Sequence, residues 1–452
     1  MSEVFCCDYA WLPDGVHADV DIEVEAGRIV AVRPHDAAAP PNAHDQCGEG
    51  GGRGVAGLVL PGFANVHSHA FHRALRGRTH DGRGSFWTWR ERMYAVAGRL
   101  DPDSYYALAR ATYAEMVLAG ISCVGEFHYL HHQPGGAPYA EPNAMGEALR
   151  AAARDAGIRL TLLDTCYLAG GLDPEGHSPL TAPQRRFGDG DALRWAARVA
   201  ALQPDATTKI GAAIHSVRAV PRDQLSDVVE AAEGRPLHVH LSEQPAENAA
   251  ARAAYGLTPT QLLDEAGALG PETTVVHATH LERADVRRLG ASRTAACFCP
   301  TTERDLADGI GPARALADAG ASLCLGSDQH AVIDPLEEAR ALEMHERLAS
   351  GERGRLTVEE LVDALTWRGH AALGWVDAGR IEVGARADLV ALRLDTARTA
   401  GSAPEQAVLA ATAGNVDTVI VEGKVIVEAG RHVTLDVARE LAAAITPLWQ
   451  DA

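Results

Sequence analysis

The chain has 452 residues, of which 46% are hydrophobic and 23% charged, and these proportions exclude general disorder. Lys and Arg number 41 against 61 Asp and Glu, which gives a formal net charge of −20. Because no basic run offsets this acidity, we expect neither nucleic acid nor an anionic membrane surface to be a partner. A small anionic substrate is not excluded, since it responds to the local field of its pocket.

The N-terminal residues lack a basic region followed by an apolar one, so no secretory signal is expected. No stretch approaches the ~18 uncharged apolar residues of a membrane helix. The eight cysteines are too few for a disulfide scaffold. We therefore expect reduced, mostly buried thiols in a cytoplasmic protein.

Both ends of the chain carry strand patterns. Residues 19–33 contain two runs of alternating apolar residues with a glycine turn between them, which predicts a β-hairpin. The same pattern returns in residues 387–392 and 416–427. We predict a small β-sandwich domain built from residues 1–56 and 381–452.

The middle of the chain, residues 57–380, alternates short β-branched runs with long helical patterns, which predicts a parallel sheet. Eight such units fit an α/β fold, the (β/α)8 TIM-type barrel. A doubly wound open sheet is less favoured, because no G-x-G-x-x-G follows an early strand. The eight runs are residues 58–66, 121–127, 158–163, 209–214, 236–241, 274–276, 294–298 and 322–325.

Histidines gather where these runs end, which is the catalytic end of such a barrel. His67 and His69 are two apart on a strand, so both side chains point to one face. Taken alone, the two residues could equally be a histidine pair on the surface or at the rim of the core, with no metal bound. With His240 and Asp328 from other strand ends, however, three nitrogens and one carboxylate predict a catalytic site for one divalent metal ion, zinc or iron(II).

Glu243 follows His240 by three residues and suits a proton shuttle between water and a leaving nitrogen. A glutamate at this place also complements a helix start, and the two readings are compatible. His277 would reach the same water from the sixth strand, unless it is a buried histidine satisfied by the backbone. We expect Asp328 to act both as a metal ligand and as a base.

Basic and hydroxyl side chains near the same strand ends predict the substrate contacts. His215 and Arg218 follow the fourth run, and Arg218 can clamp a carboxylate with two parallel hydrogen bonds. Arg90 lies in a loop rich in aromatic residues and could supply a second guanidinium, although spacing alone equally allows a surface ion pair. Tyr129 could add a hydroxyl donor.

The motifs LPGFANVHSHAFHRA, SFWTWRERMY, GEFHYLHH, HVHLSEQ and LGSDQHAVIDPLEEAR resemble the amidohydrolase superfamily. Within it they are similar to the formimidoylglutamate deiminases, which release ammonia from N-formimino-L-glutamate during histidine degradation. The resemblance implies a homodimer and a substrate with two carboxylates. It implies the metal ligands and water-contacting residues predicted above, and substrate contacts from Arg90, Tyr129, His215 and Arg218.

Two positions bear on how far the resemblance reaches. Binuclear relatives carry a carboxylated lysine at the end of strand four, whereas here that strand ends in Ile214-His215, with Lys209 at its start. The resemblance therefore implies a single metal ion. Where the family usually has a substrate-facing glutamine after HSHAF, this chain has His72, which can still donate one hydrogen bond.

Two other functions remain open at this point. A deaminase of a neutral heterocycle, such as a purine, would share the metal ligands but would not need paired arginines. A barrel that has lost catalysis and serves as a scaffold would not need the ligands, all of which this chain retains.

Overall fold

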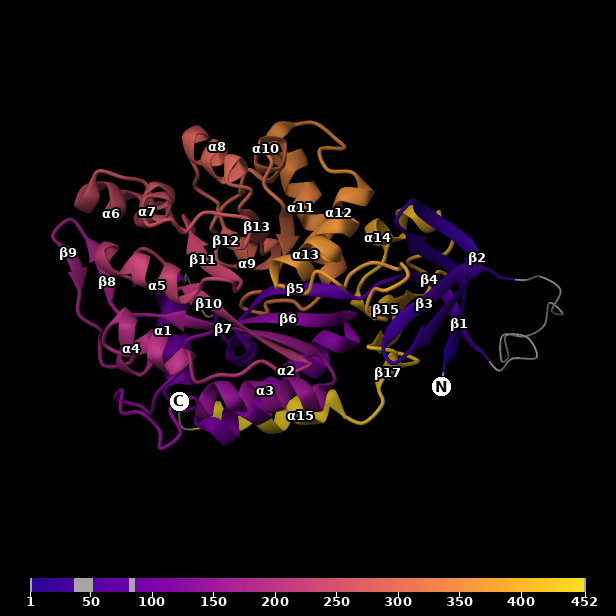
Figure 1. Ribbon diagram of the computed structural model, residues 1–452, viewed down its shortest axis with the longest axis horizontal. Helices are drawn as coiled ribbons and strands as arrows, with labels where there is room; N and C mark the ends of the chain where they lie inside the picture. Colours follow the sequence, from indigo (N-terminus) through magenta and orange to yellow (C-terminus); the bar gives the residue numbers. More distant parts are fainter. Residues whose placement is uncertain (1, 36–51, 81–85, 451–452) are drawn as a thin grey trace.

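The computed structural model describes residues 2–35, 52–80 and 86–450 (Figure 1). Its centre is a sheet of eight parallel strands in the order β14-β13-β12-β11-β10-β7-β6-β5, which confirms the predicted barrel. The strands are β5 (Phe63–Ser68), β6 (Ile121–His128), β7 (Arg159–Cys166), β10 (Thr208–Ile214), β11 (Leu237–Leu241), β12 (Thr273–His277), β13 (Ala295–Phe298) and β14 (Leu323–Leu325).

The barrel closes where β14 meets β5. A single parallel bridge joins Ser68 and Asp328, supported by backbone hydrogen bonds from Asp328 N to His67 O (2.9 Å) and from His69 N to Asp328 O (3.2 Å). Gly326 allows this approach, because a Cβ at Gly326 would lie 2.8 Å from Cβ of His67. This seam is formed by the same segments that carry His67, His69 and Asp328.

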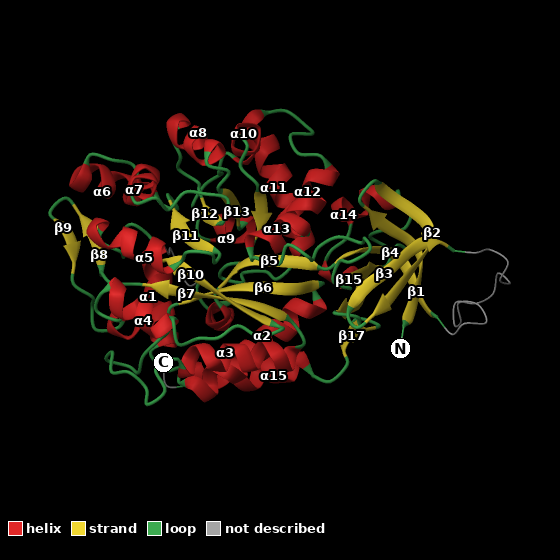
Figure 2. Cartoon of the chain, viewed as in Figure 1, coloured by secondary structure: helices red, strands yellow, loops and turns green. Residues whose placement is uncertain are grey.

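Helices surround the barrel, as expected for strand–helix units (Figure 2). Asp101 caps α2 by accepting a hydrogen bond from Ser104 N, with Pro102 in its first turn. The helices are α1 (Phe86–Ala97), α2 (Pro102–Leu118), α3 (Ala144–Ala156), α4 (Ala192–Val199), α5 (Leu225–Ala231), α6 (Pro245–Tyr255), α7 (Pro259–Glu265), α8 (Arg283–Ala291), α9 (Pro300–Asp305), α10 (Ala313–Ala319), α11 (Pro335–Ser350), α12 (Val358–Leu365) and α13 (Trp367–Ala372). A short hairpin, β8 (Gly171–Asp173) and β9 (Gly176–Ser178), extends from the region after β7.

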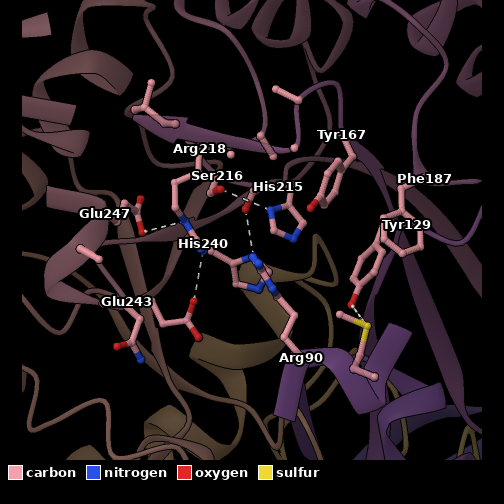
Figure 3. A pocket seen from close by; sticks show the side chains of 18 of the residues that line it. Arg90, Tyr129, Tyr167, Phe187, His215, Ser216, Arg218, His240, Glu243 and Glu247 are labelled. Carbon is pink, nitrogen blue, oxygen red and sulfur yellow. Dashed lines mark hydrogen bonds and ion pairs between the residues drawn. The ribbon is translucent and has the colours of Figure 1, made fainter. Parts of the chain in front are cut away.

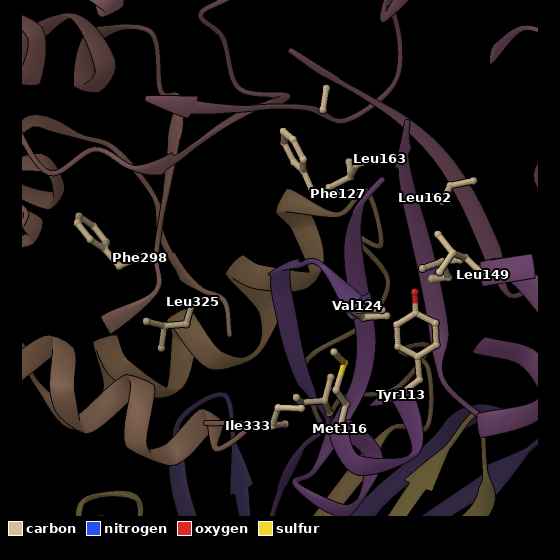
Figure 4. Packing of buried hydrophobic residues seen from close by; sticks show 14 of the residues in the cluster. Tyr113, Met116, Val124, Phe127, Leu149, Leu162, Leu163, Phe298, Leu325 and Ile333 are labelled. Atoms are coloured by element: carbon tan, nitrogen blue, oxygen red, sulfur yellow. The ribbon is translucent and has the colours of Figure 1, made fainter. Parts of the chain in front are cut away.

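The core lies between the strands and these helices. Tyr113 and Met116 of α2 pack over β6, and Leu149 of α3 packs over β7 (Figure 4). Each fully buried side chain of this size stabilises the fold by about 1.5–3 kcal/mol. This packing fixes the strands whose ends carry the polar residues.

A second eight-stranded sheet is built from both ends of the chain, as predicted, and encloses a core of its own. Its strands are β1 (Glu3–Leu12), β2 (Gly15–Glu25), β3 (Arg28–Pro34), β4 (Arg53–Pro61), β15 (Leu389–Leu392), β16 (Val416–Val421), β17 (Lys424–Glu428) and β18 (Arg431–His432). The short helix α14 (Ala407–Ala410) lies between β15 and β16. The last α-helix, α15 (Val437–Ile445), follows β18 and packs against α2 of the barrel. The last part of the chain therefore returns to the barrel.

The structure divides one predicted strand. The run expected over residues 58–66 belongs to two sheets, because β4 ends at Pro61 and β5 begins at Phe63. Gly62 between them is the turning point, and its N–H donates to Asp388 O at 2.8 Å. Both strands are buried, so the apolar pattern has no break that marks the change of sheet.

The cysteines follow the expectation only in part. Cys7, Cys123, Cys166, Cys297, Cys299 and Cys324 are free and buried, whereas Cys6 takes part in a disulfide. Cys297, Cys299 and Cys324 pack inside the barrel. In the described ranges, every helix is too short or too polar to cross a membrane.

Candidate active site

A cavity of about 230 Å³ opens at the carboxyl ends of the barrel strands (Figure 3). Ten of the residues predicted from the sequence line it: His69, His72, Arg90, Tyr129, His215, Arg218, His240, Glu243, His277 and Asp328. His67, the remaining predicted residue, is completely buried beside them. The fold therefore brings the whole predicted set to one place.

The four predicted metal ligands lie near one another at the seam, where His67 belongs to two groups of possible ligands: one with His69 and Asp328, and one with His240 and His277. Nε2 of His240 lies 3.0 Å from Nε2 of His67, and Nε2 of both His67 and His69 lies 3.4 Å from Oδ1 of Asp328. Bonds of roughly 2.0–2.2 Å in a tetrahedral zinc site place neighbouring donors roughly 3.3–3.6 Å apart. The spacing to Asp328 matches this range, and the spacing between the two histidines is a few tenths of an ångström shorter.

Backbone carbonyls set the tautomers of two of these histidines. Nδ1 of His69 donates to Phe127 O, and Nδ1 of His240 donates to His215 O, both at 2.9 Å. Because a carbonyl can only accept, the Nε2 atoms carry their lone pairs toward the cluster, as a metal ligand requires. Burial lowers the pKa of His69 to about 3, and the neighbouring His67 adds to the effect, so the imidazole is neutral at pH 7.

The carboxylate of Asp328 is ionised. Burial alone would raise its pKa, but the hydrogen bond from His67 and the nearby imidazoles of His277 and His69 hold that pKa well below its usual range. Three neutral nitrogens and one carboxylate fit a divalent ion such as zinc. The lone pairs of His69 and His240 and the ionised carboxylate of Asp328 are acceptors gathered in one buried place, so the donor set itself favours a cation.

Glu243 and His277 face the same point from the neighbouring strands. Nε2 of His277 lies 3.9 Å from Oε1 of Glu243 and 3.8 Å from Oδ2 of Asp328. On its other side, Nδ1 of His277 lies 3.5 Å from Oε1 of Glu303 on α9. Burial opposes protonation of His277, but the adjacent carboxylates of Glu303, Glu243 and Asp328 raise its pKa to about 10.

Arg218 projects into the same cavity and is paired with two glutamates (Figure 3). Its Nη2 donates to Oε2 of Glu243 at 3.4 Å, and its Nε lies 3.6 Å from Oε2 of Glu247. Glu247 stands in the first turn of α6. These two pairings orient one edge of the guanidinium toward the carboxylates.

The remaining substrate-binding candidates form an aromatic wall. Nε2 of His72 and the hydroxyl of Tyr129 are hydrogen-bonded at 3.0 Å, and the ring of His215 lies 5.6 Å from the ring of Tyr129. Arg90 on α1 places its guanidinium 5.6 Å from the ring centre of Tyr94, a cation–π contact. Lys209, the lysine at the start of the fourth strand, is not among the residues that line this cavity. Its ammonium group lies against the ring of Trp375 instead.

The sequence reasoning did not identify several pocket residues. Tyr94, Tyr167, Phe187 and Glu247 line the cavity, and Glu303 stands behind His277. Glu247 could have been found from the sequence, because it lies one helical turn after Glu243 at a helix start. Tyr94 ends the same motif as Arg90 and could have been found with it, whereas Tyr167 and Phe187 reach the site from segments that carry no local signal.

A (β/α)8 barrel with such a cluster at its strand ends is the architecture of a metal-dependent hydrolase. Residues 58–426 match the Amidohydrolase family, and the chain belongs to this family.

Relatives cover nearly the whole chain. It is 37% identical to formimidoylglutamate deiminase of Pseudomonas aeruginosa over 96% of each chain. It is also 32% identical to 8-oxoguanine deaminase of the same species over 85% of each chain. Among solved structures, an amidohydrolase from Brucella melitensis matches with a TM-score of 0.89 at 31% identity, covering 99% of both chains.

Proposed function

We propose that this enzyme hydrolyses N-formimino-L-glutamate to N-formyl-L-glutamate and ammonia, using one divalent ion, most simply zinc, held by His67, His69, His240 and Asp328. The observation that carries the proposal is the pair of arginines, Arg90 and Arg218, on a cavity that also contains the candidate metal ligands. Similarity to the formimidoylglutamate deiminase supports the same substrate.

The two carboxylates of this substrate require two separate basic partners. Arg218 with His215 and Tyr129 would hold one carboxylate, and Arg90 would hold the other. Each charge-assisted hydrogen bond contributes about 1.5–3 kcal/mol. The aromatic wall excludes water from the aliphatic part of the substrate, which strengthens these contacts.

When bound, the divalent ion would lower the pKa of water toward ~7 and polarise the formimino carbon. Glu243 is placed to accept a proton from the attacking water at one carboxylate oxygen and to return it to the departing nitrogen. Nε2 of His277 lies 3.9 Å from Glu243 and 3.8 Å from Asp328, so His277 is placed to orient the attacking water. The carbon–nitrogen bond to the amino group breaks, ammonia leaves, and the water oxygen becomes the formyl oxygen.

A deaminase acting on a purine-like ring is the alternative that the 8-oxoguanine deaminase relative raises. It would use the same ligands and the same proton shuttle. Such a neutral substrate would offer no carboxylate to Arg90 or Arg218, although both arginines line the cavity. The charged lining therefore favours the acyclic dicarboxylate.

The test is an ammonia-release assay on the purified protein, with metal content measured by elemental analysis. We expect turnover of N-formimino-L-glutamate with one metal ion per chain. The comparison substrates are 8-oxoguanine and formamidine, which has the reacting group without the carboxylates. Faster ammonia release from 8-oxoguanine than from N-formimino-L-glutamate would reject the proposal.

A further inference from the structure

Five buried side chains form a continuous set of hydrogen bonds across the barrel seam. They come from β5, from β6 and from the segment after β14, and each is at most 4% exposed. We call them the seam ring: Asn65, Ser68, Glu126, Ser327 and His330. None of them belongs to the candidate ligands or substrate contacts described above.

The hydrogen bonds run from Asn65 to Glu126. Nδ2 of Asn65 lies 2.7 Å from Oγ of Ser327, which lies 2.9 Å from Nδ1 of His330. Nε2 of His330 lies 3.2 Å from Oγ of Ser68, which donates to Oε2 of Glu126 at 2.7 Å.

Backbone N–H groups donate to the side chains at both ends of this series of hydrogen bonds. Oδ1 of Asn65 accepts from Ser327 N at 2.9 Å, and Oε1 of Glu126 accepts from Ala70 N at 2.7 Å. Each end of the set is therefore tied to a segment next to a metal-ligand candidate.

The chemistry of the two ends fixes the direction of every bond. The amide nitrogen of Asn65 can only donate, and Glu126, whose pKa is raised by burial to about 7, can only accept when ionised. Ser327 must therefore donate to Nδ1 of His330, which leaves the proton of a neutral His330 on Nε2, pointing to Ser68. One isosteric change at either end places two donors or two acceptors face to face.

The seam ring stands beside the four candidate ligands. Ser68 lies between His67 and His69 in the chain, and Asp328 lies between Ser327 and His330. The backbone of Asp328 and His330 has φ values of +44° and +59°, in the left-handed region that side chains other than glycine rarely adopt. Because the two strands share a single bridge, side-chain bonds must hold this turn against β5.

We propose that the seam ring positions His67 and His69 relative to Asp328 and so sets the affinity and geometry of the metal site. Asn65, Ser68, Glu126, Ser327 and His330 are positioning residues: they close the barrel at the one place where ligands from its first and last strands must meet. The proposal rests on these four residues being the ligands, and it does not depend on the identity of the substrate.

The test uses the full chain stripped of metal and titrated with Co²⁺, whose visible absorption reports ligand geometry, and with Zn²⁺. The variants are Glu126→Gln and Asn65→Asp, which keep shape and reverse hydrogen-bonding character, and Ser68→Ala. We expect metal affinity to fall at least tenfold in each, within the 10–100-fold typical of groups that orient ligands. The Co²⁺ absorption bands should also shift or broaden.

A matched control is Glu343→Gln. Glu343 is also a buried glutamate that accepts backbone N–H groups, those of Gly354, Arg355 and Leu356, but it lies on α11. We expect this variant to lose thermal stability and to bind Co²⁺ with the wild-type affinity and spectrum. The double variant Ser68→Ala/Glu126→Gln should lose less binding free energy than the two single losses added together, since both changes break the bond between Ser68 and Glu126.

The outcomes are separable. Wild-type affinity and spectrum in Ser68→Ala and Glu126→Gln would overturn the proposal, as would losses in Glu343→Gln as large as theirs. If Glu126→Gln does not fold, Ser68→Ala alone decides the matter, because it removes one oxygen atom. If the wild-type protein binds metal but releases no ammonia from N-formimino-L-glutamate, the proposed function fails while the metal titrations still decide this inference.

Discussion

Nε of Arg218 lies 3.6 Å from Oε2 of Glu247, and the Glu247 side chain is completely buried. Among the described residues, neither oxygen of Glu247 makes a hydrogen bond of regular geometry, although the amides of Ser242 and Glu243 face it. Burial raises the pKa of Glu247 to about 7 despite the nearby charge of Arg218. Arg218 thus serves the protein as the partner of a buried carboxylate, besides any role toward substrate.

Replacing Arg218 therefore has two separable consequences. Arg218→Met leaves Glu247 buried without its cation. Because the pKa of Glu247 is already about 7, the carboxyl then takes up a proton, and the buried group without a partner costs about 1–3 kcal/mol of unfolding free energy. The double variant Arg218→Met/Glu247→Gln should recover most of this stability. Denaturant unfolding of the three proteins measures the effect.

Kinetics should not recover with stability. In both Arg218→Met and the double variant we expect kcat/KM for N-formimino-L-glutamate to fall more than tenfold, because the proposed carboxylate clamp is removed. Formamidine, which has no carboxylate, should be turned over at rates that differ little between the wild type and the double variant. Equal losses for both compounds in the double variant would show that Arg218 does not bind a carboxylate.

Glu243→Gln tests the proton shuttle. The amide keeps the shape of the side chain and its contact with Arg218, but it cannot accept a proton. We expect kcat to fall by ~10²–10⁴, the usual contribution of general acid–base catalysis, with metal content unchanged. Turnover and elemental analysis on the same sample check this, and near-normal kcat would assign the shuttle to another group such as His277.

Much of this site could be predicted from the sequence because the barrel gives strand ends a common location. His67, His69, His240, His277 and Asp328 each close a short apolar run, so one assumption about the fold brought them together. The division between β4 and β5 could not be predicted, since burial is continuous across Gly62. Glu303 was missed because its role depends on its facing the buried His277, and spacing does not encode this.

Metal removal should affect the folded state itself. The four proposed ligands, from β5, β11 and the end of β14, would hold the ion in the folded chain only, so the ion would stabilise folding by mass action. This amounts to about 4 kcal/mol when the free metal is at ~1,000 times its dissociation constant. Dialysis against a chelator should abolish ammonia release and lower Tm, and added Zn²⁺ should restore both. A chelated protein with unchanged Tm and full activity would exclude the metal site.

A buried ion pair joins the barrel to the terminal sheet and predicts how stability depends on pH. Nη1 of Arg159 on β7 donates to Oδ1 of Asp388 at 2.8 Å, and Nη2 donates to the other oxygen. Burial alone would raise the pKa of Asp388, but Arg159 holds that pKa below its ordinary value. The stability from this lowered pKa is fully present above the unfolded-state pKa of about 3.9 and is lost as pH falls through the folded-state pKa.

Asp388→Asn should therefore lower the unfolding free energy at pH 7 by about 3–5 kcal/mol, because Arg159 is left buried without its anion. The difference from wild type should be constant from about pH 5 to 8 and should shrink as pH falls below about 4, where the wild-type carboxylate takes up a proton. Denaturant unfolding across this range measures it. Asp395→Asn is the matched control, since Asp395 pairs with Arg393 on the surface, where solvent screens the interaction, and no change is expected. A difference for Asp388→Asn that grows toward low pH would contradict the assignment, because it would require the folded state to prefer the protonated carboxyl.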